Sequence, residues 1–329
     1  MPRRYFIALL GSLGGSFALF YLALFGLGAT GHLPPPGFAN SICVDEKLAH
    51  LRDRPPQAAN LLVIGSSIAW RHFDGDVVRN ETPQAQPLNG AFCGLTINQS
   101  TYAADWLLGH NDSVREVLLI ASPHDFENCG RMRTAVFDAA DADAFVYGGS
   151  SPWPYYIKYF APAALLRNAL TVGAKRQGGA VMDPLVFDRY ASGPMENDGV
   201  RDTLLYGPVR HLDQACFDAL DRFAREMRRS GRRLMVASTP MHPAWKRQYD
   251  PSNVMQDGFG ARVRQVLAAS GGEYWDGDGA RVVSEAAFYD AIHLHWSAVA
   301  PYSAALARHF QFGVAPPAAA ASLVGASRL

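Results

Sequence analysis

The sequence predicts an α/β fold: a flavodoxin-like, mainly parallel sheet with helices on both faces, plus an N-terminal transmembrane helix. Apolar runs at 60–65, 116–122 and 232–239 are nearly continuous, as expected for parallel strands that are covered on both faces. Stretches with helical periodicity separate these runs, which is typical of alternating strands and helices. The stretch 5–30 contains no charged residue, and this predicts a helix in a membrane.

The uncharged stretch is long enough to cross a bilayer, since roughly 20 apolar residues suffice. A cleaved signal peptide has a shorter apolar region of about 7–15 residues. Arg3 and Arg4 precede the stretch, which favours a cytoplasmic N-terminus. We therefore expect segment 1–37 to be a single-pass inner-membrane anchor with a Pro-rich spacer. The rest of the chain would then lie in the periplasm or another extracytoplasmic space.

Beyond the anchor, the sequence predicts one α/β domain at 38–312 and a disordered low-complexity tail at 313–329. Residues 131–210 interrupt the strand–helix rhythm and form an insertion, with some helix expected at 163–170. This insertion is either a wall or lid over a site or a surface excursion, and both interpretations stay open. Its aromatic segment "SPWPYYIKYF" would suit stacking on sugars.

The remaining elements follow in order. A short strand is expected at the start of 87–100, and another at 273–278. Residues 212–231 predict a helix that ends before Gly231, and 297–310 predict a second one. The apolar stripe of the first helix consists of Cys216, Leu220, Phe223 and Met227.

The formal net charge is zero, so nothing in the charge balance favours a nucleic acid as a partner. The four cysteines form no Cys-x-x-Cys pair, so no metal site is expected. Outside the cytoplasm disulfides are permitted, and Cys93 and Cys129 both follow strand ends. We predict a Cys93–Cys129 disulfide, with Cys43 as the competing partner and Cys216 as a plain core residue.

Two motifs point to chemistry. The first strand ends in Gly65-Ser66-Ser67, which would place a serine at the carboxyl edge of the sheet, where ligands of open α/β sheets bind. Near the C-terminus, Asp290 and His293 lie three residues apart. In one turn, that spacing lets the carboxylate orient the imidazole, which can then accept a serine proton. The alternative for the serines is a helix cap.

The order of these loops resembles the SGNH (GDSL-like) hydrolase superfamily. The resemblance implies Ser67 as nucleophile, Asp290 and His293 as the rest of a catalytic triad, and Gly94 as a backbone donor to an oxyanion. The chain departs from the family pattern at Ser66, where an Asp is usual. It departs again where the family has an Asn that would supply another donor: this chain has His124 there, which is a candidate donor or substrate contact, with the backbone as the alternative donor.

Other residues near these motifs have weaker assignments. His295 is a neighbour of His293 or a contact for substrate, and His72 is a structural or solvated histidine. His242 and Trp245 follow a strand end and would line the acceptor side of the site.

Together these features predict a serine-dependent acyl esterase or O-acyltransferase that acts on a cell-envelope or exported polysaccharide and needs no cofactor. Its partners would be an acylated glycan or acyl donor, the inner membrane and a membrane-bound acyltransferase. The alternative is a non-catalytic scaffold or binding partner with the same fold in an envelope polysaccharide assembly. A phosphate binder is disfavoured because no glycine-rich phosphate loop is present.

Overall fold

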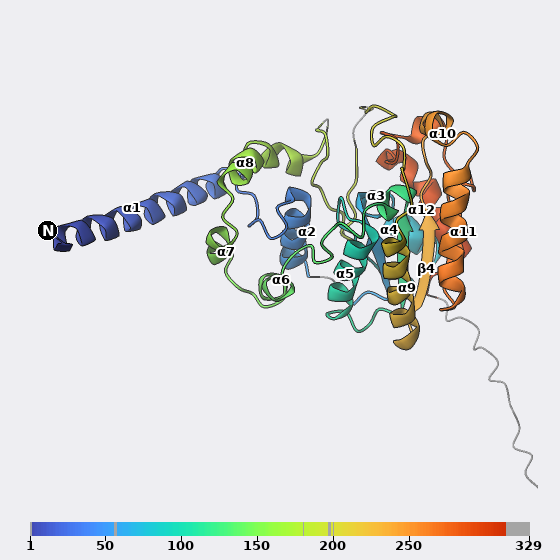
Figure 1. Ribbon diagram of the computed structural model, residues 1–329, viewed down its shortest axis with the longest axis horizontal. Coiled ribbons are helices and arrows are strands. Elements are labelled where there is room, and N and C mark those ends of the chain that lie inside the picture. Colours follow the sequence, from blue (N-terminus) through green and yellow to red (C-terminus); the bar gives the residue numbers. More distant parts are fainter. Residues whose placement is uncertain (1, 56–57, 180, 197–198, 200, 314–329) are drawn as a thin grey trace, which may run out of the picture.

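In the computed structural model, five parallel strands form one sheet in the order β2-β1-β3-β4-β5 (Figure 1). The strands are β1 (Leu61–Gly65), β2 (Pro87–Asn89), β3 (Glu116–Ala121), β4 (Arg233–Ser238) and β5 (Glu273–Trp275). This is the flavodoxin-like strand order, so the predicted fold class is confirmed. The structure describes residues 2–55, 58–179, 181–196, 199 and 201–313.

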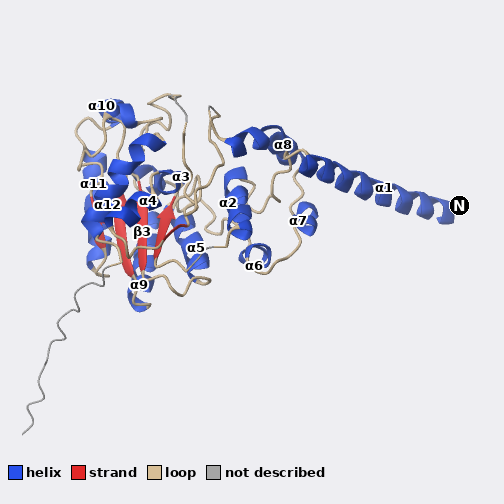
Figure 2. Ribbon diagram, turned by 180° about the vertical axis from the view of Figure 1, so that it is seen from behind, coloured by secondary structure: helices blue, strands red, loops and turns tan. Residues whose placement is uncertain are grey.

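Helices cover both faces of the sheet (Figure 2). On one face lie α5 (Ile97–Leu108), α9 (Gln214–Arg229) and α11 (Val254–Ala268). On the other lie α3 (Ser67–Arg71), α4 (Gly75–Glu81) and α12 (Val299–Phe310). The short elements around the carboxyl edge of the sheet are η1 (Pro123–Phe126), α10 (Pro243–Tyr249), η2 (Glu285–Ala287) and η3 (Trp296–Ala298).

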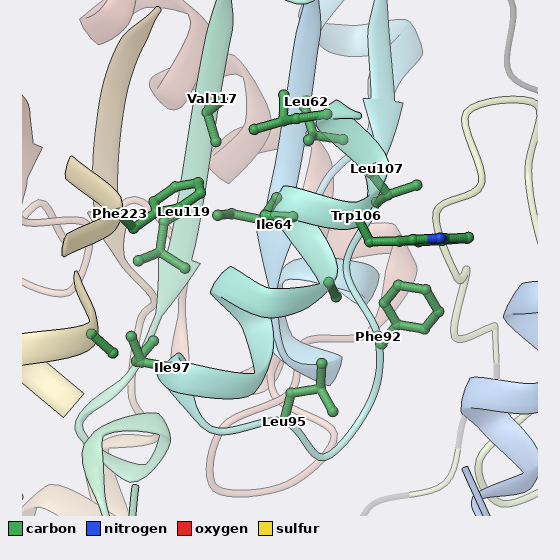
Figure 3. Close-up of a cluster of buried hydrophobic side chains, with 14 of the residues drawn as sticks. Leu62, Ile64, Phe92, Leu95, Ile97, Trp106, Leu107, Val117, Leu119 and Phe223 are labelled. Atoms are coloured by element: carbon green, nitrogen blue, oxygen red, sulfur yellow. The ribbon is translucent and has the colours of Figure 1, made fainter. Parts of the chain in front are cut away.

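Alternation along each strand divides the core into two layers. Leu62 and Ile64 of β1 pack with α5 and α9 (Figure 3), whereas Leu61 and Val63 face the layer that contains α12. This follows from the two-residue period of a strand, whose side chains point to opposite faces in turn. Because both faces are buried, the three central strands β1, β3 and β4 are largely apolar, and this is the reason they could be found in the sequence.

Helix α9 has the predicted apolar stripe. Cys216, Leu220, Phe223 and Met227 are all buried against the sheet. Each fully buried side chain of this size stabilises the fold by about 1.5–3 kcal/mol. Asp213 caps the helix by accepting a hydrogen bond from the backbone N–H of Ala215 at 3.0 Å.

The N-terminal helix α1 (Pro2–Ala29) projects away from the rest of the molecule (Figure 1). Residues Arg3–Ala29 are long and apolar enough to cross a membrane, and only 6% of an apolar 18-residue stretch within them is buried. A signal sequence near the N-terminus can meet the same criterion of length and composition. Retention in the membrane and the direction of crossing therefore stay predictions.

Four helices lie between α1 and the sheet (Figures 1 and 2). They are α2 (Ile42–Asp53), α6 (Ala139–Val146), α7 (Trp153–Lys158) and α8 (Pro162–Gln177). Helix α8 contains the helical stretch that the sequence predicts at 163–170. The predicted tail 313–329 lies outside the described residues, except for Gly313.

The disulfides differ from the prediction. The bonds join Cys43 to Cys93 and Cys129 to Cys216, so the predicted Cys93–Cys129 pair is wrong. Strand β1 lies between β2 and β3, and this separates the loops that carry Cys93 and Cys129. Cys93 instead meets the first turn of α2, while Cys129 meets the first turn of α9. Cys216 is buried as predicted, but it is a disulfide partner and not a plain core residue.

Candidate active site

Strand β1 ends at Gly65, a position where only glycine fits. Its φ of +142° is a conformation that residues with a side chain rarely adopt. A Cβ atom at Gly65 would also overlap the carbonyl oxygen of Ile120 on β3. The chain then turns sharply: Ser66 is the N-cap of α3, and Ser67 is the first helical residue. Ser67 therefore stands at the carboxyl edge of the sheet, beside β3.

The turn at 290–293 holds a carboxylate against an imidazole. One Asp290 oxygen accepts hydrogen bonds from the backbone N–H groups of Ile292 at 2.9 Å and His293 at 2.8 Å. The other oxygen lies 2.9 Å from His293 Nδ1. Burial of Asp290 favours its neutral form, but His293 and these N–H groups together hold the pKa of Asp290 below its usual value. Asp290 is thus an ionised, fixed acceptor.

The two motifs meet in space although they lie far apart in the sequence. His293 Nε2 is 2.9 Å from Ser67 Oγ. Because Nδ1 faces the ionised carboxylate of Asp290, it carries the proton, and Nε2 is free to accept one from Ser67. The three residues form the Ser-His-Asp arrangement of a nucleophile, a general base and an orienting acid.

A second histidine, His72, connects the loop that carries His293 to the end of β4. The backbone N–H of Leu294 donates to His72 Nε2 at 2.8 Å, and His72 Nδ1 is 2.8 Å from the hydroxyl of Thr239. Burial, with the nearby His293, lowers the pKa of His72 well below its ordinary value, so the ring is neutral. Since Nε2 must accept, Nδ1 holds the proton and donates it to Thr239. The interpretation of His72 as a structural histidine is confirmed.

Gly94, the predicted oxyanion donor, lies in the loop after β2. The backbone N–H of Phe92 in this loop donates to the carbonyl of Gly65 at 3.3 Å, so the loop and the Ser67 turn lie side by side. Gly94 has φ +70°, is exposed, and has open space where a Cβ would stand. A ligand could therefore approach its backbone closely. The Cys43–Cys93 disulfide holds this loop to α2.

His124, at the position where the family has an Asn, is engaged by the insertion. Its Nε2 is 3.3 Å from the carbonyl oxygen of Gly207, and its ring packs against Trp245 at 5.2 Å between centroids. Burial lowers the pKa of His124, so it is a neutral ring. Trp245 is buried and also donates to the Gly207 carbonyl, at 2.8 Å. Trp245 therefore anchors the insertion, and the expectation that it lines the acceptor side is not met.

Tyr206 of the insertion was not found by sequence reasoning. Its ring lies 5.9 Å from His293 and 6.2 Å from His124, measured between centroids. The side chain is 44% exposed, so it forms one wall of the site. Its backbone has φ +81°, an unusual conformation for a tyrosine, and such conformations gather at functional sites. This part of the insertion is a wall of the site, in agreement with one of the two interpretations.

Asp125, beside His124, is a buried carboxyl group under the serine turn. It accepts hydrogen bonds from the backbone N–H of Ser122 at 2.7 Å and from the Ser122 hydroxyl at 3.2 Å. Burial raises its pKa to about 6, against the opposing effects of Ser122, Ser66 and His293. Ser66 therefore lies between the turn that carries Ser67 and the loop after β3, and it also caps α3. This is a structural use for the residue that precedes Ser67.

Two other predicted neighbours serve the loop structure. His242 is the N-cap of α10, where its Nδ1 accepts from the backbone N–H of Ala244 at 3.0 Å, and its place on the acceptor side stays a prediction. His295 lies two residues beyond His293 and packs edge-on against Tyr289. It is thus a neighbour of the triad. No three His, Cys, Asp or Glu side chains in the described part of the chain gather as a metal would require.

Comparisons with known proteins add little. No family model and no curated protein matches the chain. Among solved structures, a candidate arylesterase from Agrobacterium tumefaciens strain C58 is similar, with a TM-score of 0.38 and 14% sequence identity. The match covers 76% of this chain and 97% of that chain. Because the TM-score is low, we draw no functional conclusion from it. Membership of the SGNH superfamily stays a prediction.

Proposed function

We propose that the protein is a serine-dependent acyl esterase or O-acyltransferase with Ser67 as its nucleophile. The hydrogen-bonded chain from Ser67 Oγ through His293 to Asp290 supports this most directly. A serine hydroxyl is a weak nucleophile unless a base removes its proton. Here the base stands at hydrogen-bond distance, and an ionised carboxylate fixes its orientation.

In the proposed reaction, Ser67 Oγ attacks the carbonyl carbon of an ester while His293 Nε2 takes the hydroxyl proton. The tetrahedral intermediate then expels the alcohol, which leaves with that proton, and an acyl-enzyme remains. Water or a sugar hydroxyl then attacks the acyl group and gives its proton to His293. The bond to Ser67 Oγ breaks, the carboxylic acid or the new ester leaves, and His293 returns the proton to Ser67. Asp290 stays ionised and stabilises the imidazolium in both halves of the reaction.

The developing oxyanion needs hydrogen-bond donors that are in place beforehand. We propose the backbone N–H groups of Ser67, at the start of α3, and of Gly94, in the adjacent exposed loop. His124 is a weaker candidate for a third donor, because its Nε2 already faces the Gly207 carbonyl.

We further propose that the acyl group is carried by a cell-envelope or exported polysaccharide. The apolar helix α1 would hold the domain at the outer face of the inner membrane, where such glycans are modified. Membrane-anchored members of the superfamily that the motifs resemble include glycan O-acetyl esterases and O-acetyltransferases. If the reaction is a transfer, a membrane-bound acyltransferase is the partner we expect to supply the acyl group.

A fluorophosphonate probe tests the nucleophile. Wild-type protein should gain one probe mass, and peptide mapping should place it on Ser67. The Ser67→Ala variant should take up no probe, while Ser66→Ala, the matched control one residue away, should still be labelled. Folded wild-type protein that stays unlabelled would favour the non-catalytic scaffold instead. Hydrolysis of p-nitrophenyl acetate, with and without an oligosaccharide acceptor, then separates esterase from transferase.

A further inference from the structure

The aromatic segment of the insertion lies beside α1 and not over the active site. Phe160 packs edge-on against Phe20 of α1, with ring centroids 5.3 Å apart. Trp153 of α7 packs against Phe25 at 4.5 Å, and its carbonyl oxygen accepts a hydrogen bond from the hydroxyl of Tyr21 at 3.2 Å. The segment that we expected to stack on sugars is thus used for contact with the last turns of α1.

The connection after α1 is also fixed to the insertion. The hydroxyl of Tyr156 donates to the carbonyl oxygen of Pro34 at 2.6 Å. Arg176 of α8 donates to the carbonyl oxygens of Gly31 at 3.3 Å and Leu33 at 3.0 Å. The same guanidinium pairs with the buried Glu46 of α2. The Pro-rich spacer therefore folds back on α7 and α8, and it holds the catalytic domain close to α1.

Large apolar side chains next to these contacts point to solvent. Ile157, Phe160, Leu166 and Leu170 are 38%, 55%, 65% and 74% exposed. We call these four residues the α7–α8 patch. Leu166 and Leu170 share one face of α8, because they are four residues apart. An exposed apolar patch of this kind marks a surface for a membrane or a partner.

The length of α1 indicates the depth at which the patch lies. A helix of 28 residues is about 42 Å long, whereas the hydrocarbon core of a bilayer is about 30 Å thick. If the core begins near Tyr5, just after the two arginines, it ends near Leu24. Phe20 and Phe25 then bracket the outer boundary of the hydrocarbon, where Trp and Tyr side chains are enriched.

We propose that the α7–α8 patch is a second membrane contact, seated in the outer interface of the same bilayer that α1 crosses. Its occupant is lipid. The inference rests on the anchor role of α1 in the proposed function. Phe160 lies deepest, since it packs on Phe20. Leu170 lies nearer the water, since α8 begins just after Phe160 and runs towards Gly173, where an added Cβ would lie 3.1 Å from the ring of His32. Such a contact fixes the orientation of the catalytic domain, which a single flexible tether would not do.

Site-directed fluorescence in bilayers tests the proposal on the full chain. All four native cysteines are in disulfides, so one added cysteine can be labelled selectively with an environment-sensitive NBD dye. Variants Phe160→Cys, Leu166→Cys and Leu170→Cys would be placed in nanodiscs of phosphatidylcholine and phosphatidylglycerol that contain doxyl-labelled lipid. Leu13→Cys in α1 is the positive control. Val254→Cys on α11, 71% exposed, is the matched negative control.

The dye at residue 160 should lose nearly as much fluorescence as the dye at 13, and the loss should decrease through 166 to 170. Quenching at 160 no stronger than at 254, with strong quenching at 13, would overturn the patch while leaving the anchor intact. Loss of quenching at 13 itself, or removal of α1 seen by mass spectrometry, would overturn both. Lipid and a protein partner are distinguished because the doxyl group is carried by lipid alone, and the scaffold protein at the rim of the discs is the same for every variant. Ile157→Cys replaces Phe160→Cys if that variant does not fold, with the same outcomes.

Discussion

Two buried carboxylates, Asp290 at the carboxyl edge of the sheet and Asp45 at the start of α2, have pKa values that shift in opposite directions. At the carboxyl edge of the sheet, the pKa of Asp290 lies below its usual value, in spite of burial. At the start of α2, burial raises the pKa of Asp45 to about 8. Two residues further on, burial lowers the pKa of the Lys47 ammonium to about 7. Burial is thus offset at Asp290, whereas it dominates at Asp45 and Lys47 of α2, as it does at Asp125.

The difference lies in the partners. Asp290 receives two backbone N–H bonds and faces His293, whereas Asp45 receives backbone bonds from Phe38 and Ala39 but lies beside Glu46. Only the first region connects to a partly exposed hydroxyl, that of Ser67. A shifted pKa therefore indicates only that a group is buried. A buried group becomes a candidate for catalysis when hydrogen bonds also connect it to an accessible nucleophile.

The comparison predicts that changes at the edge remove activity and leave folding largely intact. Ser67→Ala and His293→Ala should each lower kcat/KM for an acetyl ester by roughly 10³-fold or more, because nucleophile and base act as one unit. The double variant should be scarcely worse than either single one. Initial rates of p-nitrophenyl acetate hydrolysis, with circular dichroism to verify folding, measure this.

Ser66→Ala is the control for that experiment and should retain activity. If Ser66→Ala is inactive and Ser67→Ala is active, the nucleophile is assigned one residue too late. Wild-type turnover in all of these variants would refute the catalytic interpretation.

Asp290→Asn should have a smaller effect than loss of the base. The amide can keep an oxygen toward the backbone N–H groups of Ile292 and His293, but it cannot stabilise the imidazolium with a charge. We expect a fall in kcat of roughly 10²-fold, at the lower end of what general-base catalysis contributes. Steady-state kinetics should show KM almost unchanged. A loss as large as that of His293→Ala would mean that the amide also displaces the ring.

The sequence predicted the sheet well because its strands are buried on both faces. The run at 61–65 is apolar except for its final glycine, and the residues 117–121 and 234–237 are apolar throughout. The Asp290–His293 pair could be found because its geometry is local, within one turn. Its meeting with Ser67 followed from the rule that parallel strands place their carboxyl ends at one edge.

What could not be predicted depends on contacts between distant segments. The disulfide prediction was wrong because the sequence separation of Cys93 and Cys129 does not reveal that β1 lies between β2 and β3. His72 is adjacent to α3, but its role comes from Leu294 and Thr239, each over 160 residues away in the sequence. Tyr206 lies in an insertion with no periodic pattern, and only its position in space shows that it borders the site.

His72 is expected to act as a positioning residue, with an intermediate effect. His72→Phe keeps much of the ring volume but leaves the backbone N–H of Leu294 and the hydroxyl of Thr239 without their partner. A buried group left unpaired costs about 1–3 kcal/mol. We expect lower stability in urea and a fall in kcat of roughly tenfold, if about 1.4 kcal/mol of that cost falls on the transition state.

The activity of the folded His72→Phe variant distinguishes a role in positioning His293 from a role in folding alone. Below the melting range, where His72→Phe is folded, kcat should still be reduced and its pH profile shifted, because the His293 loop is displaced. Full activity of the folded fraction would reduce His72 to a purely structural residue.

The smallest effect on catalysis is expected in α2, where substitutions should change only the pH dependence of stability. In the folded state the raised pKa of Asp45 keeps its proton up to about pH 8, while the unfolded chain loses it near pH 4. Folding therefore takes up a proton between these values, and this contribution to stability falls as pH rises from about 4 to 8. The lowered pKa of Lys47 has the opposite sign: its contribution rises from about pH 7 to 10.5.

The two contributions together should give a minimum of stability near pH 7–8, visible as a dip in the urea midpoint. Asp45→Asn keeps an acceptor for the backbone N–H of Ala39 and should remove the acidic branch of the dip, an effect of the order of a few kcal/mol. Lys47→Met should remove the alkaline branch. Asp112→Asn, at an exposed position, should leave the curve unchanged. Activity measured where each variant is folded should stay at the wild-type level. A stability curve that Asp45→Asn does not alter would mean that Asp45 is ionised in the folded protein, and the contrast with Asp290 would then be lost.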